Sequence, residues 1–259
     1  MMFDHGQSGA GVEGVGEESG DVRFPNLNSR QRIWGLDVEV DIRPGDGVVP
    51  GGWGEEQEDP TSGVVWPVTL ILAECFDRVR GSAFLAGKRV LEVGSGTGVL
   101  GIGAAALGAH VTLSDLPSVV PHLEANVARN RPLLSRPPWG GEGVPGTAEV
   151  RAHVWGERVQ DLNPPFDLVL GSDLLYWGGW SLLDLDTRDA LLATLCAVCS
   201  EGTEVWLAFV VRDPGRELSF LLALARHFHI RVHAETPPLP ARDAAPHCEA
   251  AASVSLGRT

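Results

Sequence analysis

From residue 64 to residue 256, short apolar segments of strand type alternate with longer segments in which apolar residues recur at helical spacing. The apolar segments cover residues 88–93, 110–114, 149–155, 166–172, 204–212, 229–235 and 251–256. The segments with helical spacing cover residues 66–80, 99–108, 119–130, 184–200 and 217–228. This alternation predicts an α/β fold with a doubly wound, mostly parallel sheet.

The order of these segments also predicts where a ligand binds. Doubly wound sheets bind ligands in the crevice beyond the carboxyl ends of their strands, where the strand order reverses. The connections after residues 93, 114, 155 and 172 are therefore expected to share one crevice. Residues in these connections are the first candidates for a functional site.

The sequence divides into three stretches of different composition. Residues 1–29 form an acidic tail, which we expect to be disordered because it has little to bury. Residues 30–63 combine an alternating segment, typical of a strand or hairpin, with a loop rich in Gly, Pro and acidic residues. Residues 64–259 form the main domain, in which residues 131–148 are expected to be a surface loop because they hold four prolines and four glycines.

Charge and hydropathy exclude several classes of protein. The net charge of the 259 residues is −14, which argues against a general nucleic-acid binder because such proteins need a basic surface. The sequence has no apolar run of about 18 residues, so we expect no membrane span. Its first residues lack a secretory signal. We expect a monomer in the cytoplasm, with the nucleus as a further compartment.

One pair of cysteines has the spacing of a metal site, in the segment Cys196-Ala-Val-Cys199. A zinc site needs further ligands at matching spacing, and the sequence has no second pair. The segment is also typical of a buried helix. We therefore expect core thiols and no metal.

The strongest chemical signal is a glycine-rich turn between a strand and a helix, where residues 92–98 read Glu-Val-Gly-Ser-Gly-Thr-Gly. Alternating glycines let the backbone turn sharply and approach a ligand without interference from Cβ atoms. Amides at a helix start can bind a polar or anionic group. Asp115 ends the next strand, where its carboxylate can accept both hydroxyl protons of a ribose. The pattern favours a cofactor that contains a nucleoside.

Two cofactor classes and one structural alternative are compatible with this turn. The dinucleotide fingerprint G-x-G-x-x-G matches from Gly96 through Gly98 to Gly101, but it fails when it is read from the first glycine. The S-adenosylmethionine loop has an acid two residues before G-x-G-x-G, and Glu92 with the glycines at 94, 96 and 98 fits it. A tight turn that binds no ligand is the structural alternative.

Four motifs follow one another along the main domain. They are Val64-Val65-Trp66-Pro67, the 92–98 turn followed by Ser114-Asp115-Leu116-Pro117, Val154-Trp155-Gly156, and Gly171-Ser172-Asp173-Leu174-Leu175-Tyr176. In this order and spacing, residues 64–256 resemble the seven-strand class I protein-lysine methyltransferases of the methyltransferase-like 21 type. The resemblance implies a Rossmann-like sheet of seven strands whose last strand is antiparallel.

The resemblance implies S-adenosyl-L-methionine as the cofactor and a lysine amine of a protein substrate as the methyl acceptor. The residues that match the family's cofactor contacts are Trp66, Gly94, Ser95, Gly96, Asp115, Trp155 and Ser172, and the loop pattern adds Glu92 and Gly98. Trp155 suits the adenine face and Trp66 the sulfonium cation, although ordinary core packing is the alternative for both. A nicotinamide-dependent oxidoreductase and a cofactor-binding scaffold without transfer activity are the alternative functions. Arginine, histidine or a small molecule is an alternative acceptor.

Asp173 and Tyr176 are the candidate catalytic residues. Asp173 follows an apolar strand at its carboxyl end, where a site residue is expected, and Tyr176 follows three residues later. The resemblance implies that Asp173 orients the target amine and takes up positive charge, while Tyr176 lines the lysine channel. From the residues alone, an N-cap aspartate with the tyrosine packed behind it is the alternative.

Overall fold

The computed structural model describes residues 30–42, 62–136, 143–175, 185–236 and 251–258. The acidic tail, most of the loop that precedes the main domain, and Tyr176 lie outside the described residues. The predictions made for those parts therefore stay predictions.

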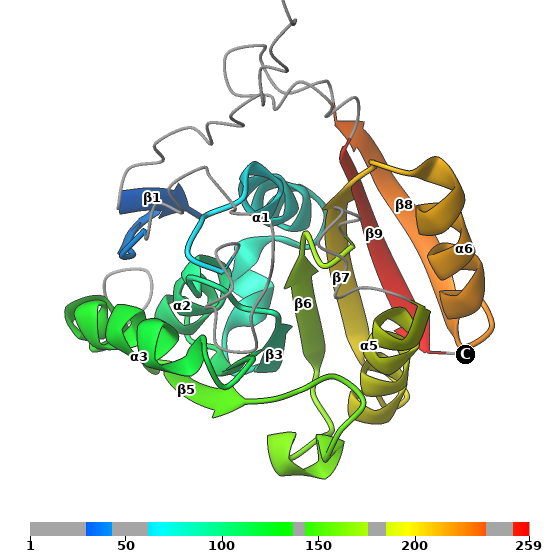
Figure 1. Cartoon of the computed structure of the whole chain (residues 1–259). Helices are drawn as coiled ribbons and strands as arrows, with labels where there is room; N and C mark the ends of the chain where they lie inside the picture. Colours follow the sequence, from blue (N-terminus) through cyan, green and yellow to red (C-terminus); the bar gives the residue numbers. More distant parts are fainter. Residues whose placement is uncertain (1–29, 43–61, 137–142, 176–184, 237–250, 259) are drawn as a thin grey trace, which may run out of the picture.

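A seven-stranded sheet forms the centre of the molecule (Figure 1), in the order β5-β4-β3-β6-β7-β9-β8. The strands are β3 Arg89–Val93, β4 His110–Asp115, β5 Thr147–Ala152, β6 Leu168–Ser172, β7 Glu204–Val210, β8 Phe228–Thr236 and β9 Ala251–Arg258. The pairings from β5 to β7 are parallel, and β9 is antiparallel to both of its neighbours. The predicted fold is therefore confirmed, including its antiparallel last strand.

Helices cover both faces of this sheet (Figure 1). They are α1 Pro67–Arg80, α2 Val99–Ala106, α3 Val120–Arg129, α4 Arg131–Leu134, α5 Leu185–Val198 and α6 Pro214–Leu224, with 3₁₀ helices at Ser82–Leu85 and Val159–Leu162. One core packs α1, α2 and α3 against one face, and a second core packs α5 and α6 against the other. Neighbouring side chains of β6 serve different cores, Val169 the second and Leu170 the first, because successive strand residues point to opposite faces. This explains why the central strands are continuously apolar.

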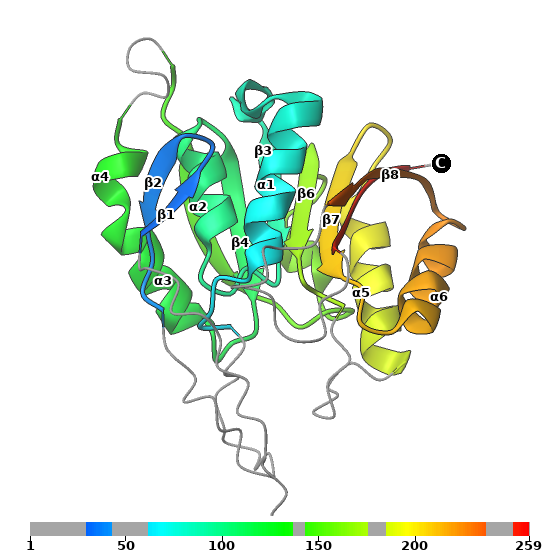
Figure 2. The same ribbon diagram turned by 90° about the horizontal axis from the view of Figure 1, so that it is seen from above.

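An N-terminal hairpin of β1 Arg30–Ile33 and β2 Leu36–Glu39 packs on the first core. Figure 2 shows it beside α2 and α3. The hairpin and α2 approach closely at Gly103, where a Cβ atom would lie 2.7 Å from the side chain of Ile33. The alternating sequence of this segment thus forms a hairpin whose apolar side joins the core of the main domain.

Two buried asparagines, Asn126 of α3 and Asn130 at the C-cap of the same helix, hold the end of this hairpin. Asn130 accepts a hydrogen bond from the Glu39 amide at 3.0 Å. Asn126 accepts one from the Asp41 amide at 2.7 Å. Both side chains are almost fully buried, so these bonds satisfy polar groups that would otherwise be costly to bury.

Helix α6 begins three residues earlier than the apolar spacing predicted. The carboxylate of Asp213 accepts hydrogen bonds from the amides of Gly215 at 3.1 Å and Arg216 at 3.2 Å, which makes Asp213 the N-cap. Pro214 occupies the first helical position, where a missing N–H costs nothing. The cap and the proline therefore set the start of the helix. The helix ends at Leu224, and β8 begins at Phe228.

Two further boundaries differ from the expectation. The stretch 131–148 was expected to be a loop throughout, but its first four residues form α4, because Pro132 suits the first turn of a helix. Strand β5 begins at Thr147, two residues before the predicted start, and ends at Ala152, so Trp155 lies in the connection that follows the strand, as expected. Among the described residues, no helix combines the length and the hydropathy needed to cross a membrane.

Candidate active site

The glycine loop joins β3 to α2 at the edge of the sheet where the carboxyl ends of the parallel strands meet. Gly94 and Gly98 have φ angles of 62° and 78°, which glycine adopts without steric cost. A Cβ atom on Gly94 would lie 2.5 Å from the side chain of Leu174, and one on Gly98 would lie 2.4 Å from that of Leu123. Both positions therefore require glycine for two reasons, the left-handed backbone and the lack of room for a Cβ atom. At these positions the loop consists of main chain without side chains.

Glu92 lies beneath this loop and is 2% exposed. Its carboxyl group accepts a hydrogen bond from the Gly101 amide in α2 at 3.0 Å, and its main-chain oxygen accepts the hydroxyls of Ser95 at 3.2 Å and Ser114 at 2.9 Å. Burial raises the pKa of Glu92 to about 8, although the Gly101 amide lowers it. Glu92 thus braces the loop from inside, and its direct contact with a cofactor stays a prediction.

Asp115 ends β4 and fastens the same loop from the other side. One carboxylate oxygen accepts the Gly96 amide and the other accepts the Leu116 amide, both at 2.7 Å. The Ser95 amide in turn donates to the main-chain oxygen of Ser114 at 3.1 Å. Because a carboxylate can accept about four hydrogen bonds, these two leave Asp115 able to receive hydroxyl donors as well.

Trp155 lies next to the glycine loop, as its sequence position predicted. An atom of its ring is 3.6 Å from the point that a Cβ of Gly94 would occupy. The turn that carries it is tied to α5, because the Gly156 amide donates to the hydroxyl of Thr194 at 2.8 Å. The indole is half-buried, so it packs against the second core and also keeps an accessible part.

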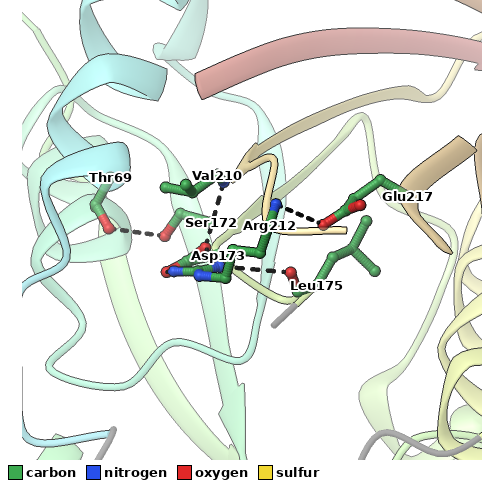
Figure 3. A network of polar contacts seen from close by, with 7 residues as sticks. All are labelled: Thr69, Ser172, Asp173, Leu175, Val210, Arg212 and Glu217. Atoms are coloured by element: carbon green, nitrogen blue, oxygen red, sulfur yellow. Dashed lines mark hydrogen bonds and ion pairs between the residues drawn. The ribbon is translucent and has the colours of Figure 1, made fainter. Parts of the chain in front are cut away.

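Trp66 and Ser172 belong to neighbouring elements on the α1 side. Trp66 is the N-cap residue of α1 and is half-buried against the first core. Ser172 ends β6, and its hydroxyl forms a 2.8 Å hydrogen bond with the hydroxyl of Thr69 in the first turn of α1. This contact makes Thr69, which the sequence analysis did not single out, part of the same site (Figure 3).

Asp173 follows β6 with a φ angle of 53°, a left-handed conformation that aspartate tolerates better than most residues. Its two carboxylate oxygens accept hydrogen bonds from Nη1 and Nη2 of Arg212, each at 2.8 Å (Figure 3). Its amide donates to the main-chain oxygen of Ala208 in β7 at 2.7 Å. The carboxylate therefore faces an arginine, and the first described helix after it begins only at Leu185.

Arg212 is a site residue that sequence reasoning missed. It lies two residues beyond β7, and its amide donates to the buried carboxylate of Glu217 in α6 at 2.9 Å. Glu217 also accepts the Asp213 amide, at 3.0 Å and 3.1 Å to its two oxygens. The only signal in the sequence was a charged residue at the end of an apolar strand, which is equally typical of a solvated strand end.

The cysteine pair lies at the end of α5. Cys199 is buried and Cys196 half-buried, and burial raises the pKa of the Cys199 thiol to about 12. Burial in apolar surroundings is typical of inert core thiols. Within the described ranges, no three His, Cys, Asp or Glu side chains are grouped so that they could hold a metal ion.

Comparison with known proteins gives one family and several relatives. Residues 53–227 match the model of a family described as lysine methyltransferase. Protein N-lysine methyltransferase METTL21A is 34% identical in mouse, over 66% of this chain and 70% of that protein, and 36% identical in zebrafish, over 65% and 69%. The mouse EEF1A lysine methyltransferase 3 is 33% identical over 65% of this chain and 64% of that protein.

Solved structures share the fold at low sequence identity. The 16S rRNA methyltransferase RsmC from T. thermophilus, in complex with AdoMet and guanosine, has a TM-score of 0.57 and 19% identity, over 89% of this chain and 50% of its own. The N-methyltransferase NodS from Bradyrhizobium japonicum, in complex with S-adenosyl-l-homocysteine, has a TM-score of 0.52 and 13% identity, over 78% and 93%. These similarities concern the fold alone.

Proposed function

Because this chain belongs to the lysine methyltransferase family, we propose that it transfers a methyl group from S-adenosylmethionine to a lysine side chain of a protein substrate, beside Asp173. The family match confirms the resemblance found in the sequence. Relatives named as protein N-lysine methyltransferases support lysine as the acceptor. Neither the fold nor the comparisons support a nicotinamide-dependent oxidoreductase.

The observation that carries the proposal is the fit of the glycine loop to this cofactor. At Gly94 the loop has no Cβ atom, and Leu174 and Trp155 border the space that such an atom would enter. Asp115 sits at the end of the next strand with a carboxylate that can accept hydroxyl donors. A ribose with two hydroxyls and a flat adenine match a carboxylate bound to the Gly96 amide and an indole beside Gly94.

We assign the cofactor contacts accordingly. Asp115 would bind the ribose, Trp155 the adenine, and the amides and carbonyls of the loop the amino-acid end. Trp66 and Ser172 lie on the α1 side, where Trp66 can face the sulfonium cation. When bound there, S-adenosylmethionine would supply an electrophilic methyl carbon. The roles of individual residues are part of the proposal.

The acceptor must reach this site as a neutral amine. A free lysine has a pKa of about 10.4, so deprotonation at pH 7 costs about 4–5 kcal/mol. Asp173 is flanked by the buried residues Leu174 and Leu175, and an apolar wall favours the uncharged form of an amine. An oxygen of Asp173 can accept an N–H of that amine and so point its lone pair at the methyl carbon. Alignment of this kind is the main source of rate in such a displacement.

The test is to label a methylation-deficient lysate with a radiolabelled methyl donor and the purified chain, and to locate the label by mass spectrometry. The proposal expects a methylated lysine in a protein. The Asp115→Ala variant should lose the label, whereas Asp161→Ala, in an exposed ion pair with Arg158, should retain it. Label on arginine, histidine or a small molecule would refute the lysine assignment. Tight cofactor binding without any acceptor would favour the scaffold alternative.

We also propose that the enzyme acts as a monomer in the cytoplasm and does not bind nucleic acid. The net charge of −14 supports the proposal that the enzyme does not bind nucleic acid, because such binding needs a basic surface. Size-exclusion chromatography with light scattering would test the monomer. Fractionation of cells with a tagged chain would test the compartment.

A further inference from the structure

The carboxylate of Asp173 and the guanidinium of Arg212 form a bidentate ion pair at the carboxyl ends of β6 and β7 (Figure 3). The side chain of Asp173 is 3% exposed and that of Arg212 is 25% exposed. The pair thus joins the buried carboxylate of Asp173 to the partly exposed guanidinium of Arg212. A planar guanidinium presents two parallel N–H donors to a carboxylate, so this contact fixes orientation as well as charge.

The arginine is itself anchored. Its amide and that of Asp213 both donate to Glu217, which is 2% exposed in α6. The Asp173 amide is bound to Ala208 of β7, so the two partners of the ion pair are attached to the same strand end. The main chain on both sides of the pair is therefore held, and neither partner can move far without breaking buried hydrogen bonds.

A buried carboxylate without a partner would be held neutral or would draw in water, because burial penalises its charged form. Arg212 donates one hydrogen bond to each oxygen of Asp173, and these two bonds hold the carboxylate in one orientation. The pair also offsets the charge of the acid and so weakens its attraction for the ammonium form of lysine, which cannot attack a methyl group.

We propose that Arg212 is a positioning residue for methyl transfer, which acts through Asp173 by fixing the orientation of its carboxylate toward the acceptor amine. This inference rests on the proposed function. Arg212 lies outside the four sequence motifs. The role requires the planar, bidentate guanidinium of arginine as well as its positive charge.

The experiment is a double-mutant cycle on single-turnover methyl transfer. The variants are Arg212→Lys, Asp173→Asn and the two combined, each measured with the substrate found in the labelling experiment. Arg212→Lys keeps the positive charge but loses the two parallel N–H donors of the guanidinium. We expect it to slow methyl transfer by about 10- to 100-fold. In the Asp173→Asn background, the same change should cost less than about twofold, because its route of action is already lost. Cofactor affinity should stay within about threefold in all three.

Arg216→Lys is the matched control, since Arg216 forms an exposed ion pair with Asp213 at the start of α6. It should leave the transfer rate unchanged. Thermal melting shows whether Arg212→Lys folds. If it does not, the double variant Asp173→Asn/Arg212→Gln replaces it, because neither new side chain carries a charge. Its transfer rate should then equal that of Asp173→Asn.

Several results would overturn the inference. In the cycle, these are a wild-type transfer rate in Arg212→Lys, or rate losses of Arg212→Lys and Asp173→Asn that simply add. In the variant that combines Asp173→Asn with Arg212→Gln, it is a transfer rate a further tenfold below that of Asp173→Asn. In any variant, it is a loss of cofactor affinity in proportion to the loss of transfer rate. Each of these presupposes that the wild-type chain methylates lysine. Failure of the proposed function would appear earlier, as wild-type protein that labels no lysine.

Discussion

Asn126 donates a hydrogen bond from its side-chain amide to the main-chain oxygen of Thr97 at 2.9 Å, which fastens helix α3 directly to the glycine loop. The oxygen of the same amide accepts the Asp41 amide at the end of the N-terminal hairpin. One fully buried side chain therefore joins the hairpin, a helix and the proposed cofactor loop.

Asn126→Ala should lower the free energy of unfolding by about 2–4 kcal/mol, because it leaves the buried main-chain oxygen of Thr97 and the amide of Asp41 without this partner. It should also weaken S-adenosylmethionine binding by about tenfold, since the loop loses a support. Asn130→Ala is the comparison, because Asn130 binds the hairpin at Glu39. That variant should lose stability but keep its cofactor affinity. Urea denaturation and calorimetry measure the two quantities, and equal affinities in both variants would contradict the coupling.

Gly98→Ala should be strongly destabilising, for two separable reasons. A positive φ angle costs a residue with a Cβ about 1–2 kcal/mol, and overpacking against Leu123 adds about 1–3 kcal/mol. Gly202 has a φ of 89° with no atom within 4 Å of its Cβ position, so Gly202→Ala isolates the first cost. The difference between the two variants in urea denaturation gives the packing cost. No difference would mean that the loop has room to relax.

The stability of the folded protein should depend on pH through Glu92. Its pKa is raised from 4.5 to about 8 by burial, so the folded state holds a proton that the unfolded state releases between these values. The contribution of Glu92 to stability is therefore complete below about pH 4.5 and is lost as the pH rises toward 8. Glu92→Gln cannot ionise, and its stability relative to wild type should rise by on the order of 1 kcal/mol per pH unit across this window. Urea denaturation of both proteins at pH 5, 6.5 and 8 would show it, and parallel curves would refute it.

Asp115→Ala should weaken S-adenosylmethionine binding by about 1.5–3 kcal/mol, the size of a hydrogen bond to a charged group. The same change removes the acceptor of the Gly96 amide, so part of the loss reflects a looser loop. Asp115→Asn keeps one acceptor oxygen and should lose less. Isothermal titration of the three proteins decides the matter, and an unchanged affinity in Asp115→Ala would remove this residue from the ribose site.

The elements that carry the site could be predicted because their signals are local. The apolar strand 88–93 and the glycines after it specify a strand, a turn and a helix whatever lies elsewhere. Asp115 and Asp173 could be placed at one edge because parallel strands bring their carboxyl ends together. The apolar spacing that predicted residues 217–228 does not include Asp213 and Pro214, whose cap and proline start α6 earlier.

The remaining site residues depend on contacts between distant parts of the chain. Arg212 meets Asp173 across 39 residues, and the pairing of β6 with β7 alone brings them together. Asn126 and Asn130 occupy one face of an amphipathic helix, where amides are usually solvated. Their burial follows from the docking of a hairpin some 90 residues earlier, which no pattern within α3 can indicate.

The bond between Asn126 and Thr97 has a reciprocal effect. If the docked hairpin helps the glycine loop to take up its cofactor, then the bound cofactor must hold the hairpin in place by the same free energy. The amide proton of Asp41, which Asn126 accepts, becomes a reporter for events in the crevice. Its exchange with deuterium should slow when the protein is saturated with cofactor, and the N-terminal segment should resist proteases for longer. Unchanged exchange at Asp41 on saturation with cofactor would refute this coupling.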